Sequence, residues 1–175
     1  MGHVLYAIAT IPSAEIHARL PRKLQSEAAA KLAAGFGGLA GLPGRISKSH
    51  SRAVVAVASA DAEVSVVGID VEWMRPDRPF DAILRSFAPT LAGAVDADAF
   101  YRAWTFLEAH FKAWQRWPGE AEIEEVLVTP PSVAPWQTRA GNQILQQRVA
   151  GDFQLTVLWQ CRGPCSVQQL LENPV

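Results

Sequence analysis

The alternation of apolar and polar positions is clearest over Val64–Glu72, where it predicts a strand. One face of this strand carries Val67, Ile69 and Val71, and the other carries Gly68, Asp70 and Glu72. Apolar segments bounded by turn residues predict further strands at Val4–Thr10, Ile46–Ser51, Ala53–Ala58, Ile123–Thr129, Ile144–Val149 and Phe153–Trp159. We expect the last three of these strands to form a closing meander.

A helical spacing of apolar residues marks Asp96–Trp117 as the longest helix. Its apolar stripe consists of Phe100, Trp104, Leu107, Phe111 and Trp114. An aspartate, Asp96 or Asp98, can cap the start of this helix. Two further helices are predicted at Lys23–Ala34 and Phe80–Phe87. A glycine-rich loop is predicted at Gly35–Gly44.

This order of strands and helices is that of an α+β protein. The chain has 175 residues, of which 49 % are hydrophobic, so it contains enough apolar material for a core. We expect one compact unit made of a short N-terminal half, residues 1–62, and a C-terminal half, residues 63–175. The C-terminal half carries the candidate metal and catalytic residues described below.

The charge is distributed unevenly between the two ends of the chain. Residues 1–52 hold seven Lys and Arg against two Glu, and the remainder holds nine basic against fifteen acidic residues. A basic first segment is typical of a site for a polyanion, although two oppositely charged halves could equally attract each other. The basic residues are scattered rather than interleaved with aromatic residues, so we do not expect nucleic-acid binding.

The chain shows no sign of export or of membrane insertion. Its longest purely apolar runs, Val4–Ala9 and Ala53–Ala58, are far shorter than the roughly 20 residues that cross a membrane. No basic patch precedes an apolar stretch at the N-terminus, so a secretory signal is not visible. We therefore expect a cytoplasmic protein in which Cys161 and Cys165 are reduced thiols, with a disulfide as the alternative.

Three carboxylates are candidates for chemistry. Asp70 and Glu72 share a strand face about 6.5 Å apart, where they repel each other unless a cation lies between them or water solvates both. Glu108 and Lys112 lie on one flank of the long helix, beside its apolar stripe. There they could border a cleft, or they could form an ordinary surface ion pair.

A polar cluster, Ser47–Arg52, places three hydroxyls, His50 and two cations in six residues. Such a cluster can donate many hydrogen bonds to phosphate oxygens, although it could also be a polar strand edge. We do not interpret Ser49 and His50 as a catalytic nucleophile and base, because adjacent residues of a strand point to opposite faces.

Together these pieces resemble the 4′-phosphopantetheinyl transferases of the Sfp type. The family's (N)LSHS motif is similar to Ser47–Ser51, and its GKP tripeptide to Gly41-Leu42-Pro43. Its GIDxE motif is present as Gly68–Glu72. Its W(S/T)xKE(A/S)xxK motif appears as Trp104–Lys112, so the matches span residues 41–112 in the family's order.

The resemblance implies two similar α/β halves related by a pseudo-twofold, with coenzyme A bound between them. It implies Mg²⁺-dependent transfer of the 4′-phosphopantetheine arm to a serine of an acyl, aryl or peptidyl carrier protein, with release of 3′,5′-ADP. By the same resemblance, a monomer that serves secondary metabolism is expected. The residues carried over are Asp70, Glu72 and Glu108 for Mg²⁺, Glu108 as base, Lys112 for the diphosphate, and Ser49 and His50 for coenzyme A phosphates.

The match departs from the family at two lysines, which are replaced here by Leu42 and Leu107. Lys48 is an additional cation beside the serine motif, and we expect it to offset part of this loss, although strand alternation turns it away from Ser49. Candidate substitutes for the family's N-terminal cations are Arg22, Lys23 and Arg45. The alternatives are a weak or inactive relative that binds coenzyme A or a carrier protein, and an unrelated nucleotide or RNA binder that uses residues 1–52.

Overall fold

The computed structural model describes residues 1–12, 14–40, 45–91, 95–132 and 134–170. Within these ranges the chain forms two four-stranded sheets and four helices, which gives an α+β fold as expected. In chain order the elements are β1 (Gly2–Thr10), α1 (Arg22–Ala40), β2 (Arg45–Ser51), β3 (Val54–Ala60), β4 (Val64–Trp73), α2 (Phe80–Arg85), α3 (Ala97–Trp114), α4 (Glu120–Val128), β5 (Trp136–Gln137), β6 (Gln143–Val149), β7 (Phe153–Cys161) and β8 (Cys165–Gln169).

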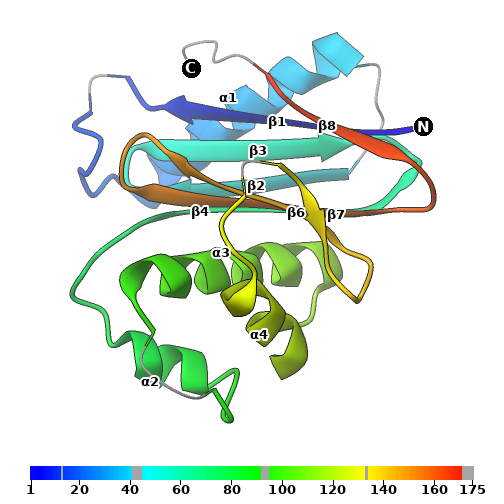
Figure 1. Ribbon diagram of the computed structural model, residues 1–175. Coiled ribbons are helices and arrows are strands. Elements are labelled where there is room, and N and C mark those ends of the chain that lie inside the picture. Colours follow the sequence, from blue (N-terminus) through cyan, green and yellow to red (C-terminus); the bar gives the residue numbers. More distant parts are fainter. Residues whose placement is uncertain (13, 41–44, 92–94, 133, 171–175) are drawn as a thin grey trace.

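The two sheets face each other between two helical layers (Figure 1). The first sheet has the strand order β2-β3-β1-β8 and the second has the order β4-β7-β6-β5. All neighbours in the sheets are antiparallel except β1 and β8, which run parallel. The C-terminal strand β8 therefore completes the sheet that the N-terminal strands form.

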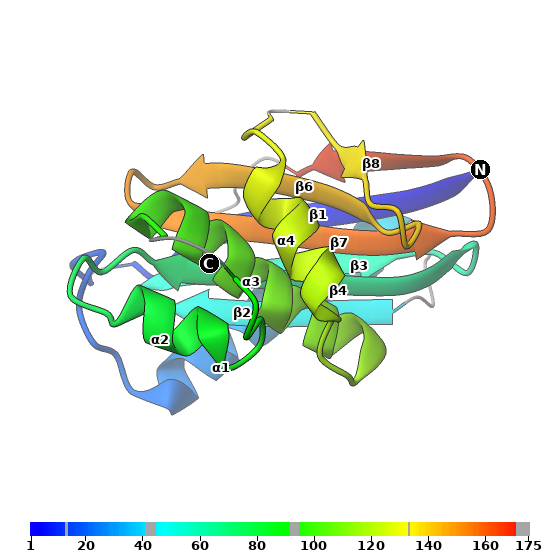
Figure 2. The ribbon, with the colours of Figure 1, turned by 60° about the horizontal axis from the view of Figure 1, so that its bottom comes forward.

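The main core fills the space between the sheets and contains Val67, Ile69 and Val71 of β4, as the alternation predicts. Helix α1 packs on the outer face of the first sheet, where Phe36 is buried against β1 and β3. Helices α3 and α4 cover the outer face of the second sheet (Figure 2), with Phe106 and Val126 packed against it. Gly68, Asp70 and Glu72 consequently lie on the side of β4 that α3 covers.

Helix α1 runs further than the predicted Lys23–Ala34 and takes in the first part of the segment predicted as a loop. Gly35 is a weak helix former. Burial of Phe36 at 3 % exposure against the first sheet supplies the tertiary contact that outweighs this preference. Residues 41–44, with Leu42 of the expected family motif, lie outside the described residues.

Helix α3 is capped as predicted, because the Asp96 carboxylate accepts a hydrogen bond from the Ala99 N–H at 2.7 Å. It ends at Trp114 rather than at residue 117, since Gln115 adopts a left-handed backbone with φ of 55°. Its 18 residues are one fewer than those of α1, so it is not the longest helix. The predicted stripe was wrong at Phe111, which is 37 % exposed.

The segment 123–129 was predicted as a strand, but it lies largely in helix α4. Its apolar residues Ile123, Val126 and Leu127 are spaced by three and four, which is a helical rather than an alternating period. The Glu122 carboxylate accepts a hydrogen bond from the Gly119 N–H at 3.1 Å, which closes the first turn. Of the three strands predicted for the meander, the second and third are β6 and β7, and the first is a helix.

The expectation of reduced thiols was wrong, because Cys161 and Cys165 form a disulfide between the end of β7 and the start of β8. The sequence alone favoured thiols because two cysteines cannot build a disulfide framework. The turn between the two strands is short enough to bring both sulfurs together, with the Cα atoms 6.4 Å apart.

Among the described residues, no helix is both long enough and apolar enough to cross a membrane. Helix α1 is the longest, and charged residues at its start, Arg22, Lys23 and Glu27, interrupt its apolar character.

Candidate functional site

Strand β2 lies beside β4 and is joined to it by serine hydroxyls. The backbone N–H groups of Ile69, Val71 and Trp73 donate to the hydroxyls of Ser47, Ser49 and Ser51 at 3.0, 3.3 and 3.1 Å. Because serines two residues apart point the same way, one strand face supplies all three acceptors. The serine motif therefore fixes β2 against the strand that carries the carboxylates.

The same hydroxyls also hold the two carboxylates of β4. Ser49 donates to Asp70 Oδ1 at 2.7 Å, and Ser51 donates to Glu72 Oε2 at 3.0 Å. Ser49 is 7 % exposed, so its hydroxyl is engaged inside the protein on both its donor and its acceptor side. Its expected contact with a coenzyme A phosphate stays a prediction.

Asp70 is the most deeply placed of the three carboxylates, with 4 % of its surface exposed. The Lys112 ammonium donates to its Oδ1 at 2.7 Å and to the Ile69 carbonyl at 3.1 Å. Its second oxygen, Oδ2, is buried without a hydrogen-bond partner. Burial raises the pKa of Asp70, although the charge of Lys112 and the hydrogen bond from Ser49 oppose this shift.

The charge of Asp70 affects the pKa values of both Glu72 and Glu108. Burial raises the pKa of Glu72, and repulsion from Asp70 raises it further, while Arg78 opposes both effects. Burial and then Asp70 also raise the pKa of the half-buried Glu108, against the attraction of Lys112. The structure thus brings Asp70, Glu72, Glu108 and Lys112 into one electrostatic group, in which three carboxylates share a single lysine.

This group partly fits a magnesium ion. Within the described ranges, no three His, Cys, Asp or Glu side chains gather closely enough to hold a metal by themselves. Mg²⁺, however, is commonly held by one or two carboxylates, with water and phosphate oxygens completing its shell. The unpartnered oxygen of Asp70 and the mutual repulsion of the carboxylates are the features that a cation would satisfy.

A cleft of about 570 Å³ opens next to the carboxylates and shares Glu72 with them. Its lining includes five arginines, which are Arg19, Arg22, Arg52, Arg75 and Arg78. His50, Ser51 and Trp73 also line it. The lining is strongly cationic, which suits a ligand with several phosphate groups.

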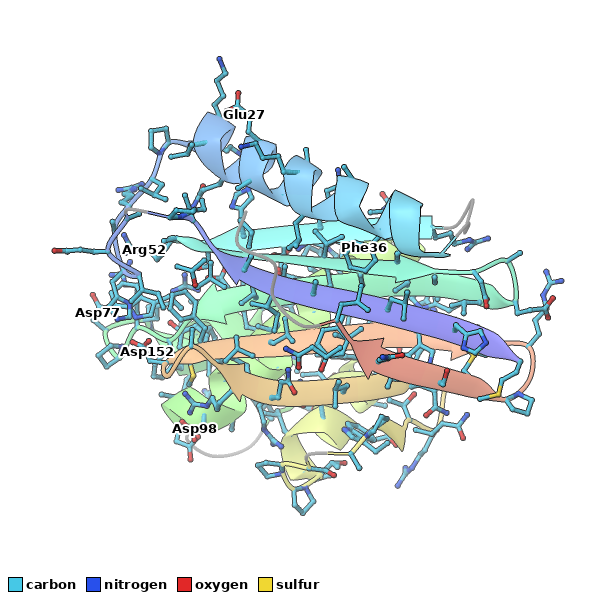
Figure 3. All side chains as sticks on the ribbon, turned by 90° about the horizontal axis from the view of Figure 1, so that it is seen from above. Glu27, Phe36, Arg52, Asp77, Asp98 and Asp152 are labelled. Atoms are coloured by element: carbon cyan, nitrogen blue, oxygen red, sulfur yellow. A yellow bond between two sulfur atoms is a disulfide. The ribbon has the colours of Figure 1, made fainter. Side chains whose placement is uncertain are left out.

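Several arginines of the cleft are held in place by neighbouring groups. The Arg52 guanidinium lies 4.5 Å from the centre of the Trp73 ring. Arg75 pairs with Asp77 at 2.6 Å, and its backbone N–H donates to the Tyr101 hydroxyl at 2.7 Å. Figure 3 shows Arg52 and Asp77 at the same end of the molecule. The cleft is therefore built from the loops at one end of β2 and β4.

His50 borders this cleft and is half-buried. Burial lowers its pKa, and the positive charges of Lys112 and Arg22 lower it further, so the neutral ring is favoured at pH 7. Lys48 is exposed and is absent from the cleft lining, as strand alternation indicates. The role expected for Lys48 stays a prediction.

The three candidate substitute cations are placed differently. Arg22 begins α1 and lines the cleft. Lys23 is exposed and lies 3.9 Å from Glu27, and Arg45 is exposed at the start of β2. Of the three, Arg22 is the one positioned to meet an anion in the cleft.

Sequence reasoning missed four cleft residues, Arg19, Arg52, Arg75 and Arg78. The charge count for residues 1–52 included the first two without locating them. The other two lie in the segment 74–79, which the prolines marked only as a turn. The sequence signal that could have found them is the segment Arg75–Pro79, in which each arginine directly precedes a proline. This segment follows the strand that carries Asp70 and Glu72.

Leu107, which stands where the family resemblance expects a lysine, is fully buried among α2, α3 and α4. It packs with Phe100 and Ile123 and therefore belongs to the core rather than to the cleft. Among the described residues, the hydrophobic cluster that contains Leu107 includes no Lys or Arg.

No family model matches the chain, and no curated protein matches it.

Proposed function

We propose that the protein transfers the 4′-phosphopantetheine arm of coenzyme A to a serine of an acyl, aryl or peptidyl carrier protein, with release of 3′,5′-ADP. The observation that carries this proposal is the junction at Glu72, where the carboxylate group adjoins the arginine-lined cleft. A substrate with a diphosphate and a separate phosphate needs both a cationic cleft and a metal-binding edge.

The order of the elements supports the proposed pseudo-twofold arrangement. In the first half, β1 is followed by α1, β2 and β3, and the strand order is β2-β3-β1. In the second half, β4 is followed by helices, then by β5, β6 and β7, and apart from the two-residue edge strand β5 the strand order is β6-β7-β4. In both halves the first strand (β1 or β4) pairs with the last strand (β3 or β7). The intervening strand (β2 or β6) then pairs with the other edge of that last strand.

The cleft supports the assignment of the substrate as a polyanion. Arg22 stands in the first turn of α1, where the helix dipole also favours negative charge. Arg78 and Arg52 supply further donors from the opposite loops. We assign the phosphates of coenzyme A to this cleft, with His50 as an additional donor or acceptor at its edge.

The acidic group supports the chemistry of transfer. When bound, Mg²⁺ would neutralise charge on the diphosphate, and Asp70, Glu72 and Glu108 are the residues that would hold it. Glu108 takes the proton from the carrier serine, directly or through water, and its raised pKa suits a base that acts near neutral pH. Lys112 stabilises the negative charge that develops as 3′,5′-ADP leaves.

The proposal is tested by the intact mass of an apo carrier protein after incubation with this protein, coenzyme A and Mg²⁺. A mass gain of one phosphopantetheine arm is expected with the natural sequence. Glu108→Gln should abolish the gain, whereas Glu27→Gln should leave it unchanged, because Glu27 is exposed on α1 (Figure 3). No gain with any acyl, aryl or peptidyl carrier would contradict the proposed transfer.

A second candidate function is favoured by Leu107. Its burial leaves no cation at a position where the family resemblance expects one beside the diphosphate. Under this alternative, the protein binds coenzyme A or a carrier protein but transfers slowly or not at all. Mg²⁺-dependent thermal stabilisation by coenzyme A, without any mass gain on the carriers, would support this binding function over the transferase.

A further inference from the structure

The disulfide between Cys161 and Cys165 contributes little to holding β8 in place. The two cysteines have a sequence separation of 4, so the bond closes a very short loop and restricts the unfolded chain only slightly. Strand β8 is also held by its parallel pairing with β1 and by a hydrogen bond of 2.8 Å between His3 Nδ1 and the Ser166 hydroxyl. The bond can therefore open while the sheet remains formed.

A cavity of about 460 Å³ lies directly beside the disulfide, and both cysteines line it. Its size is in the range of sites for small molecules. Gln137, Gln143 and Ser166 supply polar groups to its wall, and the lining contains no charged side chain among the described residues. Trp159 also lines it, and its indole N–H is buried without a hydrogen-bond partner.

Both cysteines are partly buried and both line the cavity, so a molecule bound there lies against the disulfide. Arg162 lies in the turn between the cysteines, and its exposed side chain adds a positive charge to this end of the molecule outside the cavity lining. Disulfides that solvent can reach are more labile to thiols than fully buried ones.

We propose that Cys161–Cys165 is a reversible exchange site for a low-molecular-weight thiol of the size and polarity of glutathione, which binds in this cavity. The thiolate of the incoming molecule attacks one cysteine sulfur, the bond between the cysteines breaks, and the other cysteine leaves as a thiolate that takes a proton from water. A second thiol then attacks the mixed disulfide, which releases the oxidised small molecule and leaves two cysteine thiols.

This site is separate from the arginine-lined cleft. The disulfide, drawn in yellow in Figure 3, lies at the end of the molecule opposite Arg52. Strand β7 spans the distance, since its first residue, Phe153, pairs with Trp73 of the cleft and its last residue is Cys161. Coenzyme A also carries a thiol, but it is larger than glutathione and its phosphates carry more negative charge than the glutathione carboxylates, while the described cavity lining supplies no cation to either molecule. We therefore expect glutathione to exchange faster than coenzyme A.

The first experiment exposes the folded protein to buffers with increasing ratios of reduced to oxidised glutathione, followed by alkylation and intact-mass measurement. The disulfide should open progressively without denaturant, while circular dichroism stays unchanged. In oxidised glutathione, Cys161→Ser or Cys165→Ser should gain the mass of one glutathione. If the disulfide opens only after denaturation, or if neither variant is modified, the proposal is wrong.

The second experiment tests the role of the cavity. Gln143→Glu puts a negative charge in the lining and should slow exchange with anionic glutathione about fivefold, the effect of two like charges about 4 Å apart in water. Gln168→Glu makes the same change on an exposed residue of β8 outside the lining and should leave the rate unchanged. Equal rates in both variants, or faster exchange with coenzyme A than with glutathione, would overturn the assignment of the cavity.

Discussion

Gly68 on β4 and Ala109 on α3 approach so closely that a Cβ atom at Gly68 would overlap the Ala109 carbonyl oxygen. This approach sets the distance between the strand that carries Asp70 and the helix that carries Glu108 and Lys112. The ion pair of 2.7 Å between Lys112 and Asp70 depends on it. The glycine of the expected GIDxE motif thus has a packing role that positions the acidic group.

Gly68→Ala should therefore push α3 away from β4. Overpacking of a buried contact costs about 1–3 kcal/mol of unfolding free energy, which urea denaturation can measure. Because the shift also separates Glu108 from Asp70, the proposed function predicts that carrier modification falls more than the loss of stability alone explains. Gly35→Ala is a control, since no atom lies near its hypothetical Cβ. Equal stability of Gly68→Ala and the natural protein would contradict the close packing.

The hydroxyl of Ser49 bridges two strands and a carboxylate, so its removal should be costly. Ser49→Ala leaves the Val71 N–H without its acceptor and removes one of the two donors to Asp70 Oδ1, so that Lys112 alone remains, at a cost of about 1–3 kcal/mol. Ser86→Ala, at an exposed position, should change the unfolding free energy by less than about 0.5 kcal/mol. Matching losses in the two variants would show that the hydroxyl between β2 and β4 contributes nothing.

The fold could be predicted where the local pattern and the tertiary packing agree. Val64–Glu72 alternates strictly, and it is a strand with the expected apolar face in the core. The glycines after residue 34 led to the prediction of a loop, but the helix continues through this segment. It continues because Phe36 packs against β1 and β3, and this contact between residues distant in sequence leaves no local pattern. Segment 123–129 was predicted as a strand because it is an apolar segment that follows turn residues, although the spacing of its apolar residues is helical.

The candidate site was predictable only in part for a related reason. The motifs located Asp70, Glu72, Glu108 and Lys112, because each lies in a regular element whose face can be counted from the sequence. The arginines of the cleft come from loops that meet only in the folded chain. The double role of Ser49, toward a backbone N–H and a carboxylate, also needs the β2–β4 contact, which no local pattern contains.

Arg22 and Lys23 are adjacent cations with different positions, which allows a matched test of the cleft. Arg22 lines it, whereas Lys23 has a side chain that is 88 % exposed. Under the proposed function, Arg22→Gln should weaken coenzyme A binding roughly tenfold in calorimetry, which corresponds to about 1.4 kcal/mol. Lys23→Gln should leave the dissociation constant unchanged. Equal weakening by both variants would indicate a general effect of net charge instead of a defined contact.

His110, which lies at the junction of α3 and α4, makes the free energy of unfolding depend on pH. Its ring is fully buried, with Nδ1 3.0 Å from the Arg116 carbonyl and Nε2 3.7 Å from the Glu122 carboxylate. Burial lowers its pKa, although the carbonyl and Glu122 oppose this. The folded protein therefore binds a proton at His110 less readily than the unfolded chain does. The contribution of the neutral ring to stability is present above about pH 6.5, the pKa of histidine in the unfolded chain, and is lost as the pH falls.

The contribution of His110 to the unfolding free energy should therefore decrease between pH 7.5 and pH 5.5, measured in urea titrations as the difference between the natural protein and His110→Asn, because the raised pKa values of Asp70, Glu72 and Glu108 act in the opposite direction in both proteins. His50, whose pKa is also lowered, contributes in the same direction. His110→Asn should lower stability at pH 7.5 and reduce the dependence on pH. His3→Gln, at an exposed position, should retain the full dependence. An unchanged slope in His110→Asn would show that this histidine does not titrate on unfolding.

Leu107 separates the two candidate functions. The family resemblance suggests that a lysine at this position would add a cation near the diphosphate, but the side chain of Leu107 is fully enclosed by its core cluster. Leu107→Lys would bury an unpaired ammonium and should cost about 3–5 kcal/mol of unfolding free energy. Leu107→Met, which keeps volume and polarity, should cost less than about 1.5 kcal/mol. If Leu107→Lys instead folds with little loss and increases carrier modification, the lysine reaches the cleft and the natural leucine limits transfer.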